Sequence, residues 1–239
     1  MTRQLTKEGK CLEREVSVDA GKVMLEGTLG LPDRPAGIVI FAHGSGSSRQ
    51  SPRNRYVAGV LQSQGMATLL FDLLTREEEP VDEYTRALRF DIPLLTERLV
   101  GATRWLMRHS ETRGLKIGYF GASTGAAAAL RAAAELQQAV ATIVSRGGRP
   151  DLAGDALAAV RQPALLIVGE RDEQVIEMNR EALEQLSSAD SKLVIIPGAT
   201  HLFEETGALE EVARLAAAWF KEHLAGVGAK PVGSAAGRP

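Results

Sequence analysis

The sequence predicts an α/β fold with a mostly parallel sheet, an antiparallel hairpin near its start and helices on both faces. Three observations lead to this prediction. Short apolar runs alternate with longer amphipathic segments along most of the 239 residues, which is typical of repeated strand–helix–strand units. Several of these runs are apolar throughout, as in strands covered on both faces. Residues 15–18 and 23–29 flank a turn that contains glycine, and this pattern indicates a hairpin.

The elements after the hairpin follow from apolar spacing and from glycine at helix ends. The predicted strands cover residues 37–42, 66–72, 116–120, 139–144, 164–168 and 192–196. The predicted helices cover residues 56–64, 89–107, 175–186 and 209–224, with an alanine-rich helix directly after residue 125. Residues 43–48 and 75–82 are expected to be loops. Residues 1–225 are expected to form a single domain, and residues 226–239 a flexible tail rich in glycine, alanine and proline.

Composition and charge argue against several classes of function. Apolar residues make up 44% of the chain and charged residues 24%, as in ordinary soluble proteins. The formal net charge of -2 gives no reason to expect nucleic acid or an anionic membrane as a partner. Cys11 is the only cysteine, so neither an intrachain disulfide nor a thiolate metal cluster can form. No apolar leader or membrane-length run is present, and a cytoplasmic enzyme without metal or cofactor is expected.

The most informative stretch is the run Gly-Ala-Ser-Thr-Gly at residues 121–125, between a predicted strand and a predicted helix. Glycine on each side of the serine lets the strand and the helix approach closely, and the serine is expected to be held in a strained backbone conformation. The hydroxyl of Ser123 would then project from the carboxyl edge of the sheet. This geometry suits attack on an acyl carbon, although the pattern alone also fits a glycine-flanked turn with a surface serine.

A serine nucleophile needs a base, and the base needs a carboxylate to orient it. His201 lies just beyond the last predicted strand, and Asp172 lies just beyond the strand before it. Because the carboxyl ends of parallel strands share one edge of a sheet, Ser123, Asp172 and His201 are expected to meet there as nucleophile, acid and base. Glu170 and Glu173 are alternative acids.

Residues 43–48 are expected to help stabilise the negative charge that develops on the substrate carbonyl oxygen. The backbone N–H of Thr124, at a helix start, would donate one hydrogen bond to that oxygen. The N–H of Ser45 is the expected second donor, with Gly46 as the alternative, and the small residues Gly44 and Gly46 would let the backbone come close to substrate. The remaining histidines are expected to brace this loop or to lie on the surface: His43 in the first role, His109 and His223 in the second.

Together these motifs resemble the α/β-hydrolase superfamily, and within it the dienelactone hydrolase-like branch. The resemblance covers nearly all of residues 15–225 and rests on residues 43–48, 121–125, 166–172 and 198–201. It implies an eight-stranded sheet, a Ser-His-Asp triad and metal-free hydrolysis of esters or related acyl bonds. Dienelactone hydrolases proper have a cysteine nucleophile, so Ser123 favours a serine esterase instead.

Residues 47–56 also resemble hydrolase domains that are fused to phosphoribosyltransferases. The 239 residues contain no segment that resembles such a partner domain. We therefore expect no nucleotide chemistry from this chain.

Few residues separate the predicted strands at 139–144 and 164–168, too few for a large cap domain, so an open site for small acyl substrates is expected.

Two loops at the catalytic edge are expected to carry arginines: Arg49, Arg53 and Arg55 in one, Arg146 and Arg149 in the other. Arg146 and Arg149 could recognise a carboxylate or phosphate on the substrate. Alternatively, these arginines are solvated and pair with nearby acids. The acids considered are Glu77, Glu78, Glu79 and Asp82.

The expected activity is hydrolysis of carboxylic esters with small acyl groups through an acyl-enzyme. A thioesterase, an amidase or an acyltransferase would use the same triad. An alternative from a different class of function is a binding module that has the hydrolase fold but no catalytic activity. The expected partner is a small-molecule ester, and a homodimer remains an open alternative.

Overall fold

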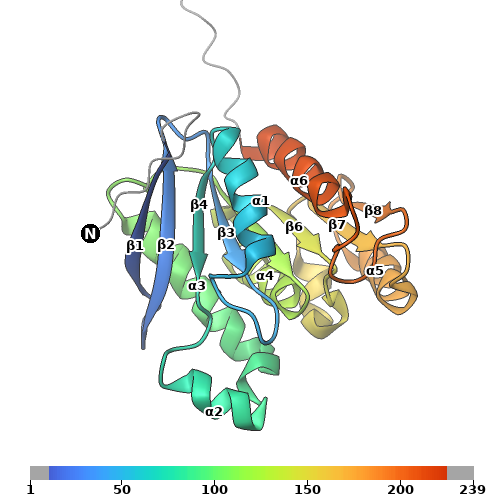
Figure 1. Ribbon diagram of the computed structural model, residues 1–239, viewed down its shortest axis with the longest axis horizontal. Helices are drawn as coiled ribbons and strands as arrows, with labels where there is room; N and C mark the ends of the chain where they lie inside the picture. The colour runs from blue at the N-terminus through green and yellow to red at the C-terminus, as the bar shows by residue number, and fades with distance from the viewer. Residues whose placement is uncertain (1–10, 225–239) are drawn as a thin grey trace, which may run out of the picture.

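An eight-stranded sheet forms the centre of the protein, which is described by a computed structural model over residues 11–224 (Figure 1). The strand order is β1-β2-β4-β3-β5-β6-β7-β8. Pairs β1–β2 and β2–β4 are antiparallel and all later pairs are parallel. The strands are β1 (Cys11–Asp19), β2 (Met24–Pro32), β3 (Ile38–Ala42), β4 (Ala67–Phe71), β5 (Ile117–Ala122), β6 (Val140–Arg146), β7 (Ala164–Gly169) and β8 (Lys192–Ile196).

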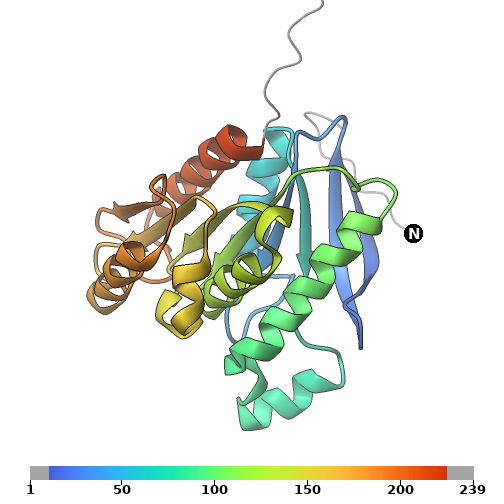
Figure 2. The ribbon, with the colours of Figure 1, turned by 180° about the vertical axis from the view of Figure 1, so that it is seen from behind.

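Helices cover both faces of this sheet, as predicted. One face carries α1 (Pro52–Ser63) and α6 (Ala208–Leu224), which pack against each other in front of the sheet in Figure 1. The other face, turned toward the viewer in Figure 2, carries α3 (Ile92–Arg108), α4 (Thr124–Leu136) and α5 (Glu173–Gln185). The predicted fold class, with its N-terminal hairpin and mostly parallel sheet, is confirmed.

Burial of the strands follows their position in the sheet. Every residue of β3, β4, β5 and β7 is buried, because each of these strands has a neighbour on both sides and helices on both faces. In the edge strand β1, by contrast, only Cys11 and Val18 are buried and the other residues are partly or fully exposed. The central strands are therefore rigid supports, and the loops at their carboxyl ends are held in place by a packed core.

A short helix, α2 (Glu78–Thr85), occupies a segment that was expected to be a polar loop, so that prediction is wrong. Thr75 and Glu78 exchange hydrogen bonds there: the Thr75 N–H donates to Glu78 Oε2 and the Glu78 N–H donates to Thr75 Oγ1. This is the capping-box arrangement, whose Thr-x-x-Glu signature is present at residues 75–78. A 3₁₀ turn, η1 (Leu88–Phe90), then precedes α3, which Asp91 caps.

The described part of the chain also contains two further 3₁₀ segments, η2 (Gln137–Ala139) and η3 (Pro150–Ala159). Between β6 and β7 the chain contains only η3 and short loops, in line with the expectation of no large cap domain. The predicted tail at 226–239 lies outside the described residues. Within residues 11–224, no helix combines the length and apolar character needed to cross a membrane.

Candidate active site

Ser123 lies between β5 and α4 in a backbone conformation that non-glycine residues rarely adopt. Its φ is 51° and its ψ is -122°, and its N–H donates to the carbonyl of Arg146 at 3.2 Å. Its own carbonyl accepts from the N–H groups of Ala126 and Arg149, each at 3.1 Å. These bonds hold the strained turn in place. The serine is only partly buried, at the start of α4, as the sequence predicted.

The two glycines that flank Ser123 are required by close backbone contacts. A Cβ added at Gly121 would lie 2.5 Å from Ala126 Cα, and one added at Gly125 would lie 2.2 Å from the carbonyl oxygen of Ala42. Such distances are far below any normal contact. The glycines therefore allow α4 to pack directly against β5 and the end of β3, which is the reason that the sequence analysis gave for them.

Asp172 and His201 form a hydrogen-bonded pair at the same edge of the sheet. The distance between His201 Nδ1 and Asp172 Oδ2 is 2.5 Å, and the exposed fractions of the two side chains are 38% and 17%. Their loops meet because Gly169 allows it: a Cβ there would lie 2.5 Å from the carbonyl oxygen of Ala199. Glu170 is engaged differently, since its Oε2 accepts from the Gly198 N–H at 2.7 Å.

The short segment 146–149 connects the serine to this pair. Gly147 follows β6 and packs against His201, since a Cβ at Gly147 would lie 3.4 Å from the imidazole Nδ1. Arg146 and Arg149 provide the two backbone bonds to Ser123 described above. The structure thus joins Asp172 to His201 directly and connects Ser123 to this pair through residues 146–149. Among the described residues, the His201 ring is hydrogen-bonded to Asp172 and not to Ser123 Oγ.

The predicted oxyanion donors lie close to each other at the start of α4. The Ser45 N–H donates to Thr124 Oγ1 at 2.9 Å, which ties the loop after β3 to the first residue of the helix. Gly44 packs against the serine, because a Cβ there would lie 3.1 Å from Ser123 Cβ. Gly46 has a φ of +69°, which favours glycine. The amide of Ser45 is therefore positioned beside the elbow but already has an acceptor in this structure.

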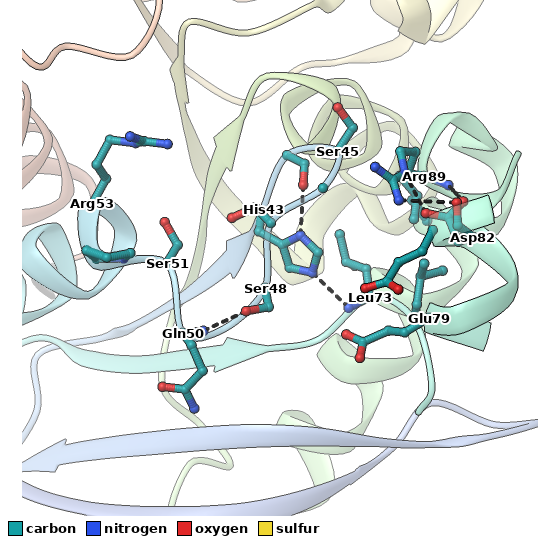
Figure 3. Close-up of a pocket in the computed structure, with 17 residues that line it drawn as sticks. His43, Ser45, Ser48, Gln50, Ser51, Arg53, Leu73, Glu79, Asp82 and Arg89 are labelled. Carbon is teal, nitrogen blue, oxygen red and sulfur yellow. Dashed lines mark hydrogen bonds and ion pairs between the residues drawn. The ribbon is translucent and has the colours of Figure 1, made fainter. Parts of the chain in front are cut away.

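The His43 side chain braces the loop of residues 43–48 (Figure 3). Its Nδ1–H donates to the Gly44 carbonyl at 3.0 Å, and its Nε2 accepts from the Leu73 N–H at 3.1 Å. Burial lowers the pKa of this histidine, so the imidazole is neutral in the tautomer that these bonds require. The predicted bracing role agrees with these contacts.

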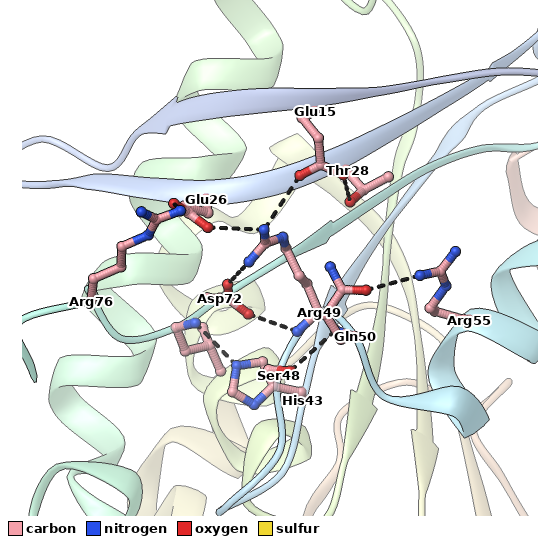
Figure 4. A network of polar contacts seen from close by, with 11 residues as sticks. Glu15, Glu26, Thr28, His43, Ser48, Arg49, Gln50, Arg55, Asp72 and Arg76 are labelled. Carbon is pink, nitrogen blue, oxygen red and sulfur yellow. Dashed lines mark hydrogen bonds and ion pairs between the residues drawn. The ribbon is translucent and has the colours of Figure 1, made fainter. Parts of the chain in front are cut away.

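An ion-pair network holds the other end of the loop (Figure 4). The Arg49 N–H donates to Asp72 Oδ1 at 2.7 Å, and the Arg49 guanidinium pairs with Asp72 and Glu26, the latter at 2.9 Å. Sequence analysis did not identify Asp72, although an acid directly after a buried strand is a usable signal. It also missed Asn179, whose Nδ2 donates to the Gly148 carbonyl at 3.0 Å and so supports the segment 146–149. No local pattern marks Asn179.

A cavity of about 610 Å³ lies beside this loop, between the start of α1 and the α2–η1 segment. Figure 3 shows Arg53 at one side of the cavity and the Asp82–Arg89 ion pair at the other. Gly44 and Ser45 contribute to its wall. The cavity therefore borders the proposed oxyanion loop, but Ser123, Asp172 and His201 are not among its lining residues. Within residues 11–224, no cluster of three His, Cys, Asp or Glu side chains is suited to hold a metal ion.

The two candidate substrate-binding arginines differ in their surroundings. Arg146 was predicted to lie in a loop, and this prediction is wrong. It is the last residue of β6 and is 8% exposed. Arg149 forms two hydrogen bonds with Asp151, at 2.8 and 2.7 Å. The prediction that the loop arginines pair with the acids of residues 77–82 is also wrong. Two of these acids pair instead with other arginines, Glu78 with Arg98 of α3 and Asp82 with Arg89 of η1.

Comparison with known proteins agrees with this architecture. A dienelactone hydrolase from Anabaena variabilis ATCC 29413, known from its crystal structure, is 62% identical, with a TM-score of 0.88 over 90% of this chain and 99% of that chain. Est1E from Butyrivibrio proteoclasticus shares the fold, with a TM-score of 0.72 over 87% of this chain and 98% of that chain at 17% identity.

A longer relative comes from Mycobacterium tuberculosis (strain H37Rv) and is named "Putative phosphoribosyl transferase Rv0571c". It is 57% identical over 216 residues, which are 90% of this chain and 48% of that protein. This chain therefore spans about half the length of that relative. The model of the dienelactone hydrolase family matches residues 25–224. The resemblance inferred from the sequence is confirmed, and the chain belongs to the dienelactone hydrolase family.

Proposed function

We propose that the chain is a serine hydrolase that cleaves carboxylic esters of small acyl groups through an acyl-enzyme. The observation that carries this proposal is the 2.5 Å hydrogen bond between His201 and Asp172, at the sheet edge where Ser123 occupies a strained strand-to-helix turn. A carboxylate that holds Nδ1–H leaves Nε2 as the basic nitrogen of the imidazole. The family membership supports the same class of chemistry.

In the proposed reaction, Ser123 Oγ attacks the ester carbonyl carbon while His201 Nε2 takes the hydroxyl proton. The tetrahedral intermediate collapses by breaking the bond to the alcohol oxygen, which receives the proton from His201. Water then attacks the acyl-enzyme with the same base, and the carboxylic acid leaves. Asp172 orients the imidazole and stabilises its cationic form throughout.

The negative charge on the carbonyl oxygen would be stabilised at the start of α4. The Thr124 N–H is at the helix N-terminus, where unpaired amides and the helix dipole favour an anion. The Ser45 N–H would be the second donor. Since that amide now donates to Thr124 Oγ1, the substrate oxygen would share or replace the threonine hydroxyl as its acceptor. Gly44 and Gly46 would keep the loop close to the bound ester.

The test is hydrolysis of p-nitrophenyl acetate and butyrate by the purified protein, compared with Ser123→Ala and with protein treated with a serine-directed organophosphonate. We expect a burst of p-nitrophenol in the wild type, its loss in Ser123→Ala, and phosphonate bound covalently to Ser123. Equal activity in Ser123→Ala would contradict the mechanism. Absence of both hydrolysis and labelling would favour the silent binding module. Thioester and amide analogues in the same assay would separate the esterase from the other acyl-transfer activities.

A further inference from the structure

The side-chain hydroxyl of Thr124 is a buried polar group whose hydrogen has no acceptor in the described structure. Thr124 is the first residue of α4 and is 3% exposed. Its Oγ1 accepts from the Ser45 N–H at 2.9 Å, and among residues 11–224 it donates to no other group. The buried hydroxyl of Thr96 instead donates to the carbonyl of Ile92 at 2.7 Å. Buried polar hydrogens normally have an acceptor, so the Thr124 hydroxyl needs an explanation.

The position of Thr124 in the chain explains why its hydroxyl hydrogen is free. A threonine inside a helix can donate to the carbonyl four residues earlier, as Thr96 does in α3. Four residues before Thr124 the chain is still in β5, so α4 offers its side chain no such carbonyl. The hydroxyl is therefore at the open N-terminal end of the helix, beside the Thr124 N–H, which also has no acceptor within the helix.

This free hydroxyl lies where negative charge would develop in the proposed reaction. The strained turn at Ser123 directly precedes Thr124, and Gly44 packs against it, since a Cβ there would lie 3.1 Å from Ser123 Cβ. The reaction would place the carbonyl oxygen of the substrate against the Thr124 N–H. Because Oγ1 belongs to the same residue as that N–H, the oxygen would be within reach of the hydroxyl. The Ser45 N–H, the other expected donor, points at Oγ1 itself.

We propose that the Thr124 hydroxyl is a catalytic donor that binds the substrate oxyanion while its Oγ1 keeps the bond from the Ser45 N–H. This inference rests on the proposed function and adds a side-chain donor to the backbone donors. In the tetrahedral intermediate the oxyanion would accept from both the N–H and the O–H of Thr124, and no proton would be transferred. The bond from Ser45 polarises the hydroxyl and makes it a stronger donor.

The hydroxyl should act on the rate of acylation more than on substrate binding. A hydrogen bond to an ionised acceptor is stronger than one to a neutral oxygen. The bond from Thr124 would therefore strengthen as the neutral carbonyl of the ester becomes an oxyanion. Only interactions that are stronger in the transition state than in the ground state accelerate the chemical step.

Three single-residue variants test the proposal. Thr124→Val keeps the shape of the side chain and removes the hydroxyl, whereas Thr124→Ser keeps the hydroxyl. Thr96→Val is the matched control, because it removes a buried threonine hydroxyl from α3, outside the candidate site. The measurements are kcat and KM for p-nitrophenyl butyrate, the rate of inactivation by a serine-directed organophosphonate, and the thermal midpoint. The phosphoryl oxygen of the inhibitor would bind where the substrate oxyanion does.

We expect Thr124→Val to lower kcat/KM roughly 10²- to 10³-fold, mainly through kcat, and to slow the reaction of the phosphonate with Ser123. Thr124→Ser should stay within about fivefold of the wild type because the donor remains. Thr96→Val should lower the thermal midpoint and leave both rates unchanged. Equal or higher activity in Thr124→Val would overturn the proposal, because the hydroxyl would then only occupy the place of the substrate oxygen. A loss in Thr124→Ser as large as that in Thr124→Val would also overturn it.

A crystal structure of the wild-type protein with the phosphonate on Ser123 separates the hydroxyl from the Ser45 amide. We expect the phosphoryl oxygen to lie about 2.7 Å from Thr124 Oγ1, with the Ser45 N–H still bonded to Oγ1. A phosphoryl oxygen bonded to the Ser45 N–H, with the Thr124 side chain rotated away, would overturn the proposal.

Failure of the proposed function would be recognised separately. In that case the wild type would neither hydrolyse the ester nor react with the phosphonate, and the role of Thr124 would be refuted with it. If the wild type is active and labelled at Ser123, equal rates in Thr124→Val would refute only the role of the hydroxyl.

Discussion

Two histidines follow strands at the same edge of the sheet, but their surroundings give them different capacities. His43, after β3, is 8% exposed, and both its ring nitrogens are engaged with backbone groups of residues 44 and 73. The His201 side chain, after β8, is 38% exposed, and its Nδ1 contacts a carboxylate. Because both ring nitrogens of His43 are hydrogen-bonded to the backbone, the ring cannot transfer a proton without breaking bonds that hold the loop. We therefore expect the partners of the ring, more than its place in the fold, to decide whether it can transfer a proton.

The largest expected difference between the two histidines is in catalysis. His201→Ala should lower kcat for p-nitrophenyl butyrate roughly 10⁴- to 10⁶-fold, because it removes the proposed base. His43→Gln should retain most activity, because the glutamine carbonyl can still accept from the Leu73 N–H. Steady-state kinetics of the two purified variants, with circular dichroism to verify folding, measures this. An equal loss of activity in His43→Gln and His201→Ala would contradict these different roles of the two histidines.

Replacing the carboxylate that contacts His201 should have the next largest effect. Asp172→Asn preserves the shape of the side chain but favours the wrong tautomer of the imidazole, and kcat should fall about 10²- to 10⁴-fold. Glu170→Gln is the matched control, because Glu170 bonds to the Gly198 N–H instead of to the histidine. It should change kcat by less than about fivefold, since its amide oxygen can still accept that bond. A greater loss in Glu170→Gln than in Asp172→Asn would reassign the acid.

The smallest expected effect concerns the pH dependence of stability. The pKa of His43 is lowered from its usual 6.5 by burial, so the unfolded chain binds a proton there at a higher pH than the folded protein does. Stability should therefore fall as the pH decreases below about 6.5, by at most about 1.4 kcal/mol per pH unit. Urea unfolding of wild type and His43→Gln between pH 7 and pH 5 measures this. The slope should be smaller in the variant, and identical slopes would refute this contribution of His43.

Much of the fold and part of the site could be predicted because the signals are local. Alternating apolar runs specify strands and helices within about ten residues, and the glycines at 121 and 125 mark a close approach of adjacent segments. The segment at 75–85 shows the limit of that approach: its acidic residues suggested a loop, although its Thr-x-x-Glu capping box begins a helix.

By itself, the sequence determined the order of strands and helices, the turn at Ser123 and the placement of Asp172 and His201 beyond strand ends. Only the tertiary structure decided that Asp172, rather than Glu170 or Glu173, contacts His201. It also decided that Arg149 pairs with Asp151, whereas Arg146 Nε has no hydrogen-bond partner among residues 11–224. The reason is physical: these contacts join loops from different strands, and their partners depend on sheet register and on close backbone approaches such as that of Gly169 to residue 199.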